Sequence, residues 1–308
     1  MAVVAAALVP AGCGGHGPAQ PAARKPPKPQ VVLPNGGRMV PIGGGRTLYL
    51  RCVGSGSPTV VLEAGFGGTT NAWSAVQPAL GRTTRTCAYD RAGLGNSLAI
   101  PGVHDASDEI ADLARLLDHA GVKPPYVLVG HSYGGLLARL FAAAHPRDTA
   151  GVVLVDAVGR NQERRLLGLW RAAPPDVRRK IPKPTSQPVE DGVDLLAGDR
   201  LGAKVTTLGH IPLAVVSRGR PDAGTSELPP QVRRAVERLW STMQDELAAL
   251  SSDHVHVVAA RSTHFIPSYA GGQPGVVVRA VRAVVDAARS GTRLPPCRRI
   301  FRGAGVRC

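Results

Sequence analysis

The chain has 308 residues, of which 44% are hydrophobic and 19% are charged, and it contains 37 glycines and 27 prolines. A mostly disordered protein is excluded, because the apolar fraction is too high and the charged fraction too low. Collagen and solenoid folds are excluded as well, since glycine follows no fixed period and no longer unit repeats. Apolar runs after the first dozen residues are too short to span a membrane. We therefore expect one globular domain behind a processed front end.

The 37 basic and 22 acidic residues give a formal net charge of +15, which is a common sign of nucleic-acid binding. Arginine outnumbers lysine 31 to 6, however, and the basic residues are spread along the whole chain. Only 4% of the residues are aromatic, too few to alternate with basic residues as stacking platforms for bases. We therefore expect no nucleic-acid partner.

Residues 1–12, MAVVAAALVPAG, form a short apolar run that reaches Cys13, and a Pro/Gly/Ala-rich stretch follows. A run of this length is typical of a secretion signal and not of an anchor helix. The Pro-Ala-Gly-Cys stretch resembles a bacterial lipoprotein cleavage site, which implies that a lipidated Cys13 tethers the protein to a membrane. We expect residues 1–40 to be a leader and flexible tether, and the protein to be secreted or held at the extracytoplasmic surface of a bacterial envelope. An ordinary cleaved signal or a disordered arm is the alternative.

The four other cysteines are an even number, which favours disulfides in an exported protein. Cys52 and Cys87 lie in strand-like segments, and Cys297 and Cys308 bracket an arginine-rich tail that has no clear apolar pattern. Pairing 52 with 87 and 297 with 308 is the simplest of the three connectivities. The sequence has neither a Cys-x-x-Cys pair nor a His/Cys cluster with zinc spacing, so we expect no metal.

From about residue 46, short β-branched runs alternate with helical patterns. This alternation predicts an α/β fold, with an open and mostly parallel sheet covered by helices on both faces. We place the domain at residues 41–290 and a tail at residues 291–308. The runs expected to form strands are Leu48–Val53, Thr59–Glu63, Thr86–Tyr89, Tyr126–Val129, Val152–Val155, Leu213–Ser217 and Val255–Ala259.

Four segments have helical patterns. Ser107 is expected to cap a helix that ends at Gly121, and a second helix is expected at about residues 134–145. Stripes of apolar residues predict two more helices, from Val232 to Leu250 and from Pro274 to Ala288. Residues 159–209 interrupt the alternation with helix-like fragments broken by proline and glycine. Because long insertions in compact domains are usually lids or binding loops, we expect a cap there.

Residues 125–139 carry the clearest chemical signal. An apolar strand leads into the sequence GHSYG at residues 130–134, and an apolar helix follows. Glycines two residues either side of Ser132 allow the sharp strand-to-helix turn that exposes a serine nucleophile. The turn also places Ser132 at a helix N-terminus, where amide donors favour negative charge.

Because of this strand–GHSYG–helix turn, residues 46–289 resemble members of the α/β-hydrolase superfamily, in its serine esterase/lipase branch. Three further segments match in chain order. Residues 63–68, EAGFGG, resemble the turn that supplies an oxyanion donor, although Ala64 stands where the family usually has histidine. Residues 89–97, YDRAGLGNS, resemble a structural loop of the family, and His264 follows the last core strand, where the family keeps its catalytic histidine.

A serine hydroxyl needs an adjacent base, and His264 has the chain order and loop position for that role. Two aspartates are candidates for the acid that orients the histidine. Asp156 directly follows one expected strand, whereas Asp222 lies in a loop after another, where many family members carry the acid. A rigid strand end positions a carboxylate better than a loose loop, so we favour Asp156 and keep Asp222 open.

The resemblance also implies an oxyanion hole formed by the backbone amides of Phe66 and Tyr133. Four aromatic side chains are candidates for lining an apolar acyl pocket, with a place in the core as the equal alternative for each: Phe66, Trp73, Tyr133 and Trp170.

These features predict a serine hydrolase that cleaves carboxylic esters through an acyl-serine intermediate, without a cofactor or metal. Serine at the turn argues against dehalogenase and epoxide-hydrolase chemistry, which place aspartate there. Thioesterase, lactonase, peptidase and cofactor-free haloperoxidase activities are alternatives, because they share this machinery. A non-catalytic cell-envelope binding protein on a hydrolase scaffold is an alternative from another class.

Overall fold

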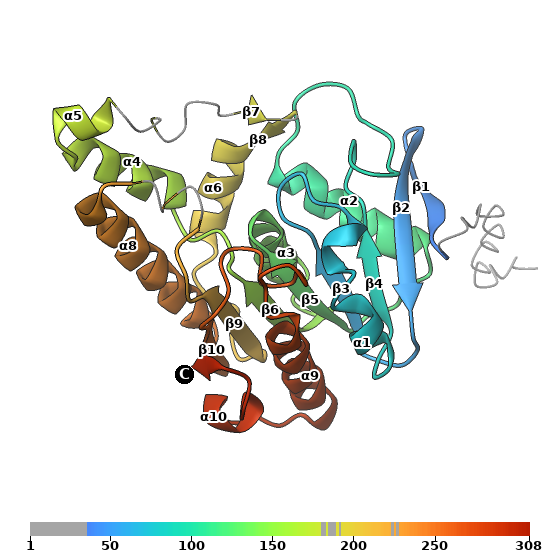
Figure 1. Cartoon of the computed structure of the whole chain (residues 1–308). Helices are drawn as coiled ribbons and strands as arrows, with labels where there is room; N and C mark the ends of the chain where they lie inside the picture. Colours follow the sequence, from blue (N-terminus) through green and yellow to red (C-terminus); the bar gives the residue numbers. More distant parts are fainter. Residues whose placement is uncertain (1–35, 180–182, 184–188, 191, 223–224, 226–227) are drawn as a thin grey trace, which may run out of the picture.

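The computed structural model describes residues 36–179, 183, 189–190, 192–222, 225 and 228–308, so the expected lipidation site Cys13 lies outside the described residues. In this part of the chain, nine strands form one sheet in the order β1-β2-β4-β3-β5-β6-β9-β10-β11 (Figure 1). Neighbouring strands run parallel from β4 to β10 and antiparallel at the two edges, which confirms the α/β class and the mostly parallel sheet. The strands are β1 (Arg38–Gly43), β2 (Arg46–Val53), β3 (Thr59–Glu63), β4 (Thr86–Tyr89), β5 (Tyr126–His131), β6 (Thr149–Val155), β9 (Leu213–Arg218), β10 (His254–Ala259) and β11 (Val306–Arg307).

Helices cover both faces of the sheet (Figure 1). On one face lie α2 (Ala106–His119), α3 (Tyr133–Ala144) and α8 (Pro230–Ala248), and on the other lie α1 (Gln77–Gly81), α9 (Pro274–Ser290) and α10 (Cys297–Ile300). The central strands are apolar almost throughout because both of their faces are covered; every residue of β3 and β5 is buried. This covering leaves the ends of the strands, and the loops that follow them, as the places where a site can form.

The insertion between β6 and β9, which we call the cap, lies beyond the carboxyl ends of the strands (Figure 1). Val193 and Val205 of the cap pack with Leu136 and Leu137 of α3 in a separate apolar cluster. A β-bridge between Val193 and His104 joins the cap to the loop that precedes α2. The described elements of the cap are α4 (Gln162–Ala172), α5 (Pro175–Arg178), β7 (Val189–Glu190), β8 (Val193–Asp194) and α6 (Leu195–Lys204).

The seven expected strands and four expected helices are present, but two features differ from the prediction. Residues 38–40, expected to belong to the flexible tether, form the start of β1, where Val40 is fully buried. The start of α2 also differs. Asp105 caps this helix, because its carboxylate accepts the amides of Ser107 and Asp108 while the Asp108 carboxylate accepts the Asp105 amide. The prediction that Ser107 is the cap was therefore wrong. The tail also holds more structure than expected: Phe301 is buried against the sheet, and β11 pairs with β10 at the sheet edge.

Both expected disulfides are present. Cys52 and Cys87 are paired across the neighbouring strands β2 and β4, and Cys297 is bonded to Cys308 across the tail. Disulfides form and persist in oxidising compartments, so they favour a location outside the cytoplasm. Within the described residues, each helix is too short or too polar to cross a bilayer.

Replacing Cys52 and Cys87 together by alanine is expected to lower the free energy of unfolding by about 4 kcal/mol, because this bond closes a loop of 35 residues in the unfolded chain. Replacing Cys297 and Cys308, which are 11 residues apart, is expected to cost about 3 kcal/mol. Denaturant titration of the oxidised proteins measures both losses. Two disulfide-free variants as stable as the parent protein would contradict the expectation.

Candidate active site

Ser132 stands at the turn between β5 and α3, at the carboxyl edge of the sheet. Its backbone has φ 54° and ψ −120°, a conformation that a residue with a side chain rarely adopts. Ser132 is the N-cap of α3, and its amide donates to the carbonyl oxygen of Val155 at 3.0 Å. The strained turn lifts the half-buried serine out of the strand, as a serine nucleophile requires.

The glycines around Ser132 are required by close backbone contacts. A Cβ on Gly130 would lie 2.2 Å from the carbonyl oxygen of Gly134, and a Cβ on Gly134 would lie 2.3 Å from that of Glu63. A Cβ on Gly65 would lie 3.4 Å from the Cβ of Ser132. The end of β3 and the turn after it are therefore packed directly against the serine turn.

His264 and Asp156 are in direct contact, although 108 residues separate them in the chain. His264 follows β10, Asp156 follows β6, and Nδ1 of His264 lies 2.7 Å from Oδ2 of Asp156. Nδ1 carries the proton in this bond, because an ionised carboxylate can only accept. Nε2 of His264 then has its lone pair available to accept a proton, which is the property that a general base for serine needs.

Asp156 is completely buried, and its carboxylate has several donors. Oδ1 accepts from the backbone amide of Arg218 at 2.9 Å and from Nε1 of Trp240 at 2.8 Å, and Oδ2 accepts from the Arg218 guanidinium at 3.2 Å. Burial by itself raises the pKa of Asp156, but the hydrogen bond from His264 and the charge of Arg218 outweigh it and hold the pKa below its ordinary value. The carboxylate is therefore ionised and fixed in orientation.

Arg218 and Trp240 were not predicted from the sequence. Arg218 ends β9, the neighbour of β6, and its guanidinium lies 4.2 Å from the centre of the Trp240 ring. The Arg218 guanidinium also donates to Glu237, so Asp156 and Glu237 share this arginine. The only available signal was the position of Arg218 at the end of an expected strand, and an arginine there does not identify its partner.

Asp222, the other candidate acid, lies in the loop after β9 and is partly exposed. Its backbone carbonyl accepts from the amide and from the hydroxyl of Thr225. Because the single Nδ1 proton of His264 is directed at Asp156, the structure pairs the histidine with Asp156 of the two candidates.

His131, the residue before Ser132, connects the serine turn to the loop of His264. Its Nε2 donates to the backbone carbonyl of His264 at 2.9 Å, and the two rings have centroids 4.7 Å apart. Burial, together with the nearby His264, lowers the pKa of His131 to about 4, so this imidazole is neutral around neutral pH. His131 therefore keeps the histidine loop next to the serine without adding a second positive charge.

The amide of Tyr133 has a fixed direction. In a trans peptide, the carbonyl of one residue and the N–H of the next point in opposite directions. The carbonyl of Ser132 accepts from the amides of Gly135, at 2.9 Å, and Val158, at 3.1 Å. The N–H of Tyr133 therefore points away from these groups, as one of the unpaired amides in the first turn of α3.

The turn after β3 holds Phe66, the other residue whose amide was expected to bind an oxyanion. Its ring meets the Tyr133 ring edge to face, with centroids 5.7 Å apart. A small cavity between this turn and the cap has a mixed apolar and charged lining, made by Phe66, Gly67, Arg91, Ala92, Leu94, Glu109 and Val193.

Two other aromatic residues lie elsewhere. Trp73 is fully buried in the core on the α9 side of the sheet, so of the two alternatives for this residue the structure supports the core. Trp170 lies on α4 of the cap, and the Arg178 guanidinium is 5.8 Å from the centre of its ring.

Glu63, the last residue of β3, is a fully buried carboxyl group close to the serine turn. The Tyr89 hydroxyl donates to it at 2.9 Å. Burial raises the pKa of Glu63 to about 7, although the charge of Arg91 and the hydrogen bond from Tyr89 act in the opposite direction.

Replacing Glu63 by glutamine is expected to flatten the dependence of stability on pH. A carboxyl with a raised folded-state pKa contributes stability at acidic pH, and this contribution is lost as the pH rises through about 7. The native protein should lose on the order of 2 kcal/mol more than the variant between pH 5 and pH 8. The glutamine oxygen still accepts from Tyr89, and other titrating groups cancel in the comparison. Denaturant titrations at both pH values measure the difference, and equal losses would refute this expectation.

A second Ser–His–Asp set joins β9, β10 and α8. Oγ of Ser217 lies 2.8 Å from Nε2 of His256, and Nδ1 of His256 lies 2.8 Å from Asp245. Ser217 is 4% exposed and lies within a strand, so its hydroxyl is not presented to a substrate. These contacts attach α8 to the sheet, and α8 carries Trp240 to Asp156.

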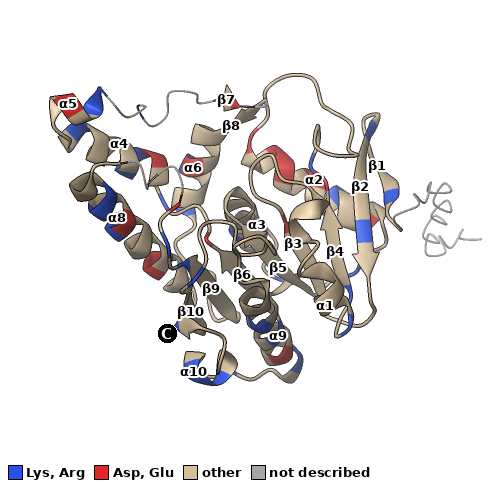
Figure 2. Ribbon diagram, in the orientation of Figure 1, with Lys and Arg blue, Asp and Glu red and all other residues tan. Residues whose placement is uncertain are grey.

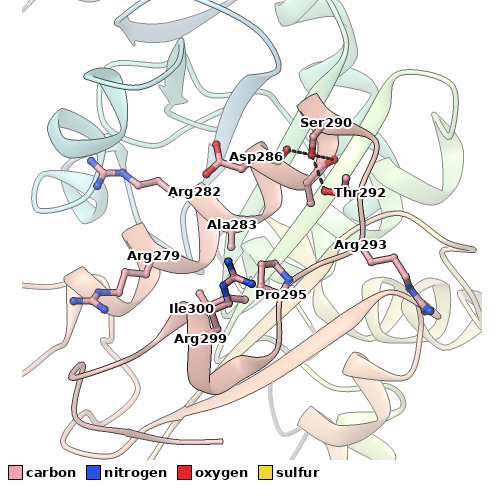
Figure 3. Close-up of a pocket in the computed structure, with 11 residues that line it drawn as sticks. Arg279, Arg282, Ala283, Asp286, Ser290, Thr292, Arg293, Pro295, Arg299 and Ile300 are labelled. Atoms are coloured by element: carbon pink, nitrogen blue, oxygen red, sulfur yellow. Dashed lines mark hydrogen bonds between the residues drawn. The ribbon is translucent and has the colours of Figure 1, made fainter.

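A hollow of about 330 Å³ lies between α9 and α10, on a different part of the molecule from the cap. Figure 3 shows Arg279 and Arg282 extending to one side of it and Arg293 to the other, so these side chains do not converge on one point. Lys and Arg also occur on α5, α8 and β2 (Figure 2). The hollow is therefore part of a generally basic surface. Among the described residues, no three His, Cys, Asp or Glu side chains gather into a metal-binding group.

The sheet, the serine at a strained strand-to-helix turn and the buried His–Asp pair at the same edge define a hydrolase-type framework. The family described as the alpha/beta hydrolase fold matches residues 58–208, and the chain belongs to the α/β-hydrolase superfamily. The chain is 27% identical over 214 residues to the uncharacterized protein YqjL of Bacillus subtilis (strain 168), covering 69% of this chain and 79% of that protein. It is 34% identical over 118 residues to the putative carbamate hydrolase RutD of Azorhizobium caulinodans, covering 38% of this chain but only 44% of that relative.

Solved structures show the same fold. A thermophilic esterase from Thermogutta terrifontis superposes with a TM-score of 0.55 at 22% identity, covering 82% of this chain and 98% of that chain. A meta-cleavage product hydrolase from Pseudomonas fluorescens IP01 superposes with a TM-score of 0.56 at 16% identity, covering 81% of this chain and 97% of that chain. At these identities the likeness concerns the fold alone.

Proposed function

We propose that this protein is a serine hydrolase that cleaves carboxylic esters, with Ser132 as nucleophile, His264 as general base and Asp156 as the orienting acid. The observation that carries the proposal is the 2.7 Å contact between His264 and a buried, ionised Asp156, in a loop that His131 ties to the residue before Ser132. A His–Asp pair next to a serine at a strained turn has the arrangement that nucleophilic acyl transfer requires.

In the proposed reaction, the Ser132 oxygen attacks the ester carbonyl carbon while Nε2 of His264 takes the hydroxyl proton. Asp156 keeps Nδ1 of His264 protonated and stabilises the imidazolium. The imidazolium then gives its proton to the departing alcohol, which leaves an acyl group on Ser132. Water then attacks the acyl group while the same imidazole takes its proton, and the acid is released as the imidazolium returns that proton to the Ser132 oxygen.

The negative charge that develops on the carbonyl oxygen needs donors that are already in place. We assign this role to the amides of Phe66 and Tyr133, and each such donor typically contributes about 3–4 kcal/mol to transition-state stabilisation. The fixed direction of the Tyr133 N–H and its place at the N-terminus of α3 support the assignment.

We also propose that the protein is exported, and that a lipidated Cys13 tethers it to the extracytoplasmic face of a membrane. The two disulfides support an oxidising location. The tether rests on the sequence pattern before Cys13, in residues outside the described part of the chain.

The proposal is tested by treating the purified protein with a fluorophosphonate probe, locating the modified residue by mass spectrometry, and measuring a panel of phenyl esters of increasing acyl length. A matched phenyl carbamate and a thioester in the panel distinguish ester hydrolysis from carbamate and thioester hydrolysis. We expect one probe per chain, on Ser132, and turnover of the esters. A chain that takes no probe, or takes it on another serine, would overturn the proposal.

A further inference from the structure

Arg91, in the loop after β4, is a buried arginine that touches the turn beside Ser132. It is 4% exposed, and its guanidinium donates to two consecutive backbone carbonyls: Nη1 to Ala64 at 2.6 Å and Nη2 to Gly65 at 2.7 Å. A planar guanidinium presents its donors in a rigid fork, so one side chain can hold two neighbouring carbonyls at once. Arg91 therefore fixes two successive peptide groups of this turn.

Holding the Gly65 carbonyl also determines the direction of the Phe66 amide. The carbonyl of Gly65 and the N–H of Phe66 belong to one trans peptide and point in opposite directions. With the carbonyl held by Arg91 and by the amide of Gly68, at 3.0 Å, the N–H of Phe66 points away from Arg91. A rotated peptide would turn a carbonyl oxygen toward the space that the Phe66 N–H now faces, and a developing oxyanion would be repelled there.

Arg91 is itself held by Glu109 and Tyr133. Its Nε lies 3.3 Å from one carboxylate oxygen of Glu109, and the Tyr133 hydroxyl donates to the other oxygen at 2.6 Å. The guanidinium also lies 5.4 Å from the centre of the Tyr133 ring. All three side chains are buried, so each of these bonds forms in a low-dielectric environment where it is strong.

We propose that Arg91 is a positioning residue for the oxyanion hole: its guanidinium holds the Gly65–Phe66 peptide in the orientation in which the Phe66 N–H can donate. Glu109 and the Tyr133 hydroxyl in turn position Arg91. The network then connects both halves of the hole, because Tyr133 supplies one amide and, through its side chain, supports the arginine that orients the other. This inference rests on the proposed function.

The test compares three variants in the full chain. Arg91→Lys keeps the charge but loses the fork, and Tyr133→Phe removes only the hydroxyl, leaving the ring and the amide. Tyr126→Phe is the matched control, since this buried tyrosine also donates one hydrogen bond, to the carbonyl of Val122 at 2.8 Å, at the opposite end of β5. For each protein we would measure kcat and KM with a phenyl ester, the melting temperature, and the inhibition constant of a trifluoromethyl ketone, which forms an oxyanion on a serine nucleophile.

We expect Arg91→Lys to lower kcat by about 30-fold and Tyr133→Phe by about fivefold, with KM changed little, because loss of a whole oxyanion donor costs more than this. The affinity for the ketone should fall in parallel with kcat/KM in both variants and stay at the native value in Tyr126→Phe. A loss of stability alone does not change the ratio of ketone affinity to KM.

The inference is overturned if Arg91→Lys and Tyr133→Phe keep native kcat, or if ketone affinity and KM change by the same factor. Tyr133→Phe keeps the test decisive if the lysine variant does not fold. Failure of the proposed function has a different signature, because the native protein then neither takes the fluorophosphonate nor cleaves the ester.

Discussion

Replacing Ser132 by alanine is expected to lower kcat for ester hydrolysis by roughly 10⁵–10⁶-fold and to abolish fluorophosphonate labelling. The variant retains the amides of Phe66 and Tyr133, so it should keep ester binding and a small rate above the uncatalysed reaction. The backbone at this position has φ 54°, and alanine carries the same Cβ as serine, so the turn should keep its shape. Steady-state hydrolysis of a phenyl ester, with intact-mass analysis after probe treatment, measures both effects.

Ser217→Ala is the matched control for this experiment. Ser217 has the same hydrogen-bonded histidine and aspartate as a catalytic serine, but it is 4% exposed within β9. We expect its removal to change the melting temperature slightly, through the lost bond to His256, and kcat by no more than about twofold. A large loss of activity in Ser217→Ala together with an active Ser132→Ala would show that the wrong serine has been assigned.

Replacing Asp156 by asparagine is expected to lower kcat by roughly 10³–10⁴-fold at neutral pH. The asparagine oxygen can still accept from Trp240 and from the Arg218 amide, and this bonding turns its NH₂ group toward Nδ1 of His264. Nδ1 must then accept rather than donate, so the proton moves to Nε2 and the histidine cannot take the proton of Ser132. The pH dependence of kcat/KM and the single-turnover rate of acylation measure this loss.

Asp222→Asn is the matched control, because Asp222 was the other candidate acid and the Nδ1 hydrogen bond of His264 goes to Asp156. We expect its kcat to stay within about threefold of the native value, as for most substitutions away from a site. Both variants need a melting temperature, since Asp156→Asn also weakens the bond to Arg218 inside the protein. If the two variants have equal activity, the pairing seen in the structure is not the catalytic one.

The strands and helices could be predicted from the sequence because their signals are local. Runs such as Thr59–Glu63 are buried throughout and apolar at their centre, since both faces of the sheet are covered, and the glycines around Ser132 mark a turn that few other residues allow. Edge elements were harder to predict. β11 has two residues and forms because Phe301 packs on the sheet nearby and the bond between Cys297 and Cys308 closes the tail.

The network around the site could not be predicted in the same way. Arg91 and Arg218 are two among 31 arginines, and only the fold brings one to the carbonyls of Ala64 and Gly65 and the other to Asp156. Trp73 shows the converse: it was a candidate for the site because it lies near a motif in the sequence, but its side chain packs in the core on the other side of the sheet.

The amino-acid order by itself determined the class of fold and identified Ser132 and His264 as the candidate reacting pair, because those signals lie in short segments with characteristic spacing; for the cysteines it gave the simplest of three pairings, which the structure confirms. Only the tertiary structure showed that His264 contacts Asp156 and which groups Arg91 and Arg218 bind. Those contacts depend on which strand ends are neighbours and where side chains point, and side-chain contacts between distant segments are set by packing rather than by local sequence.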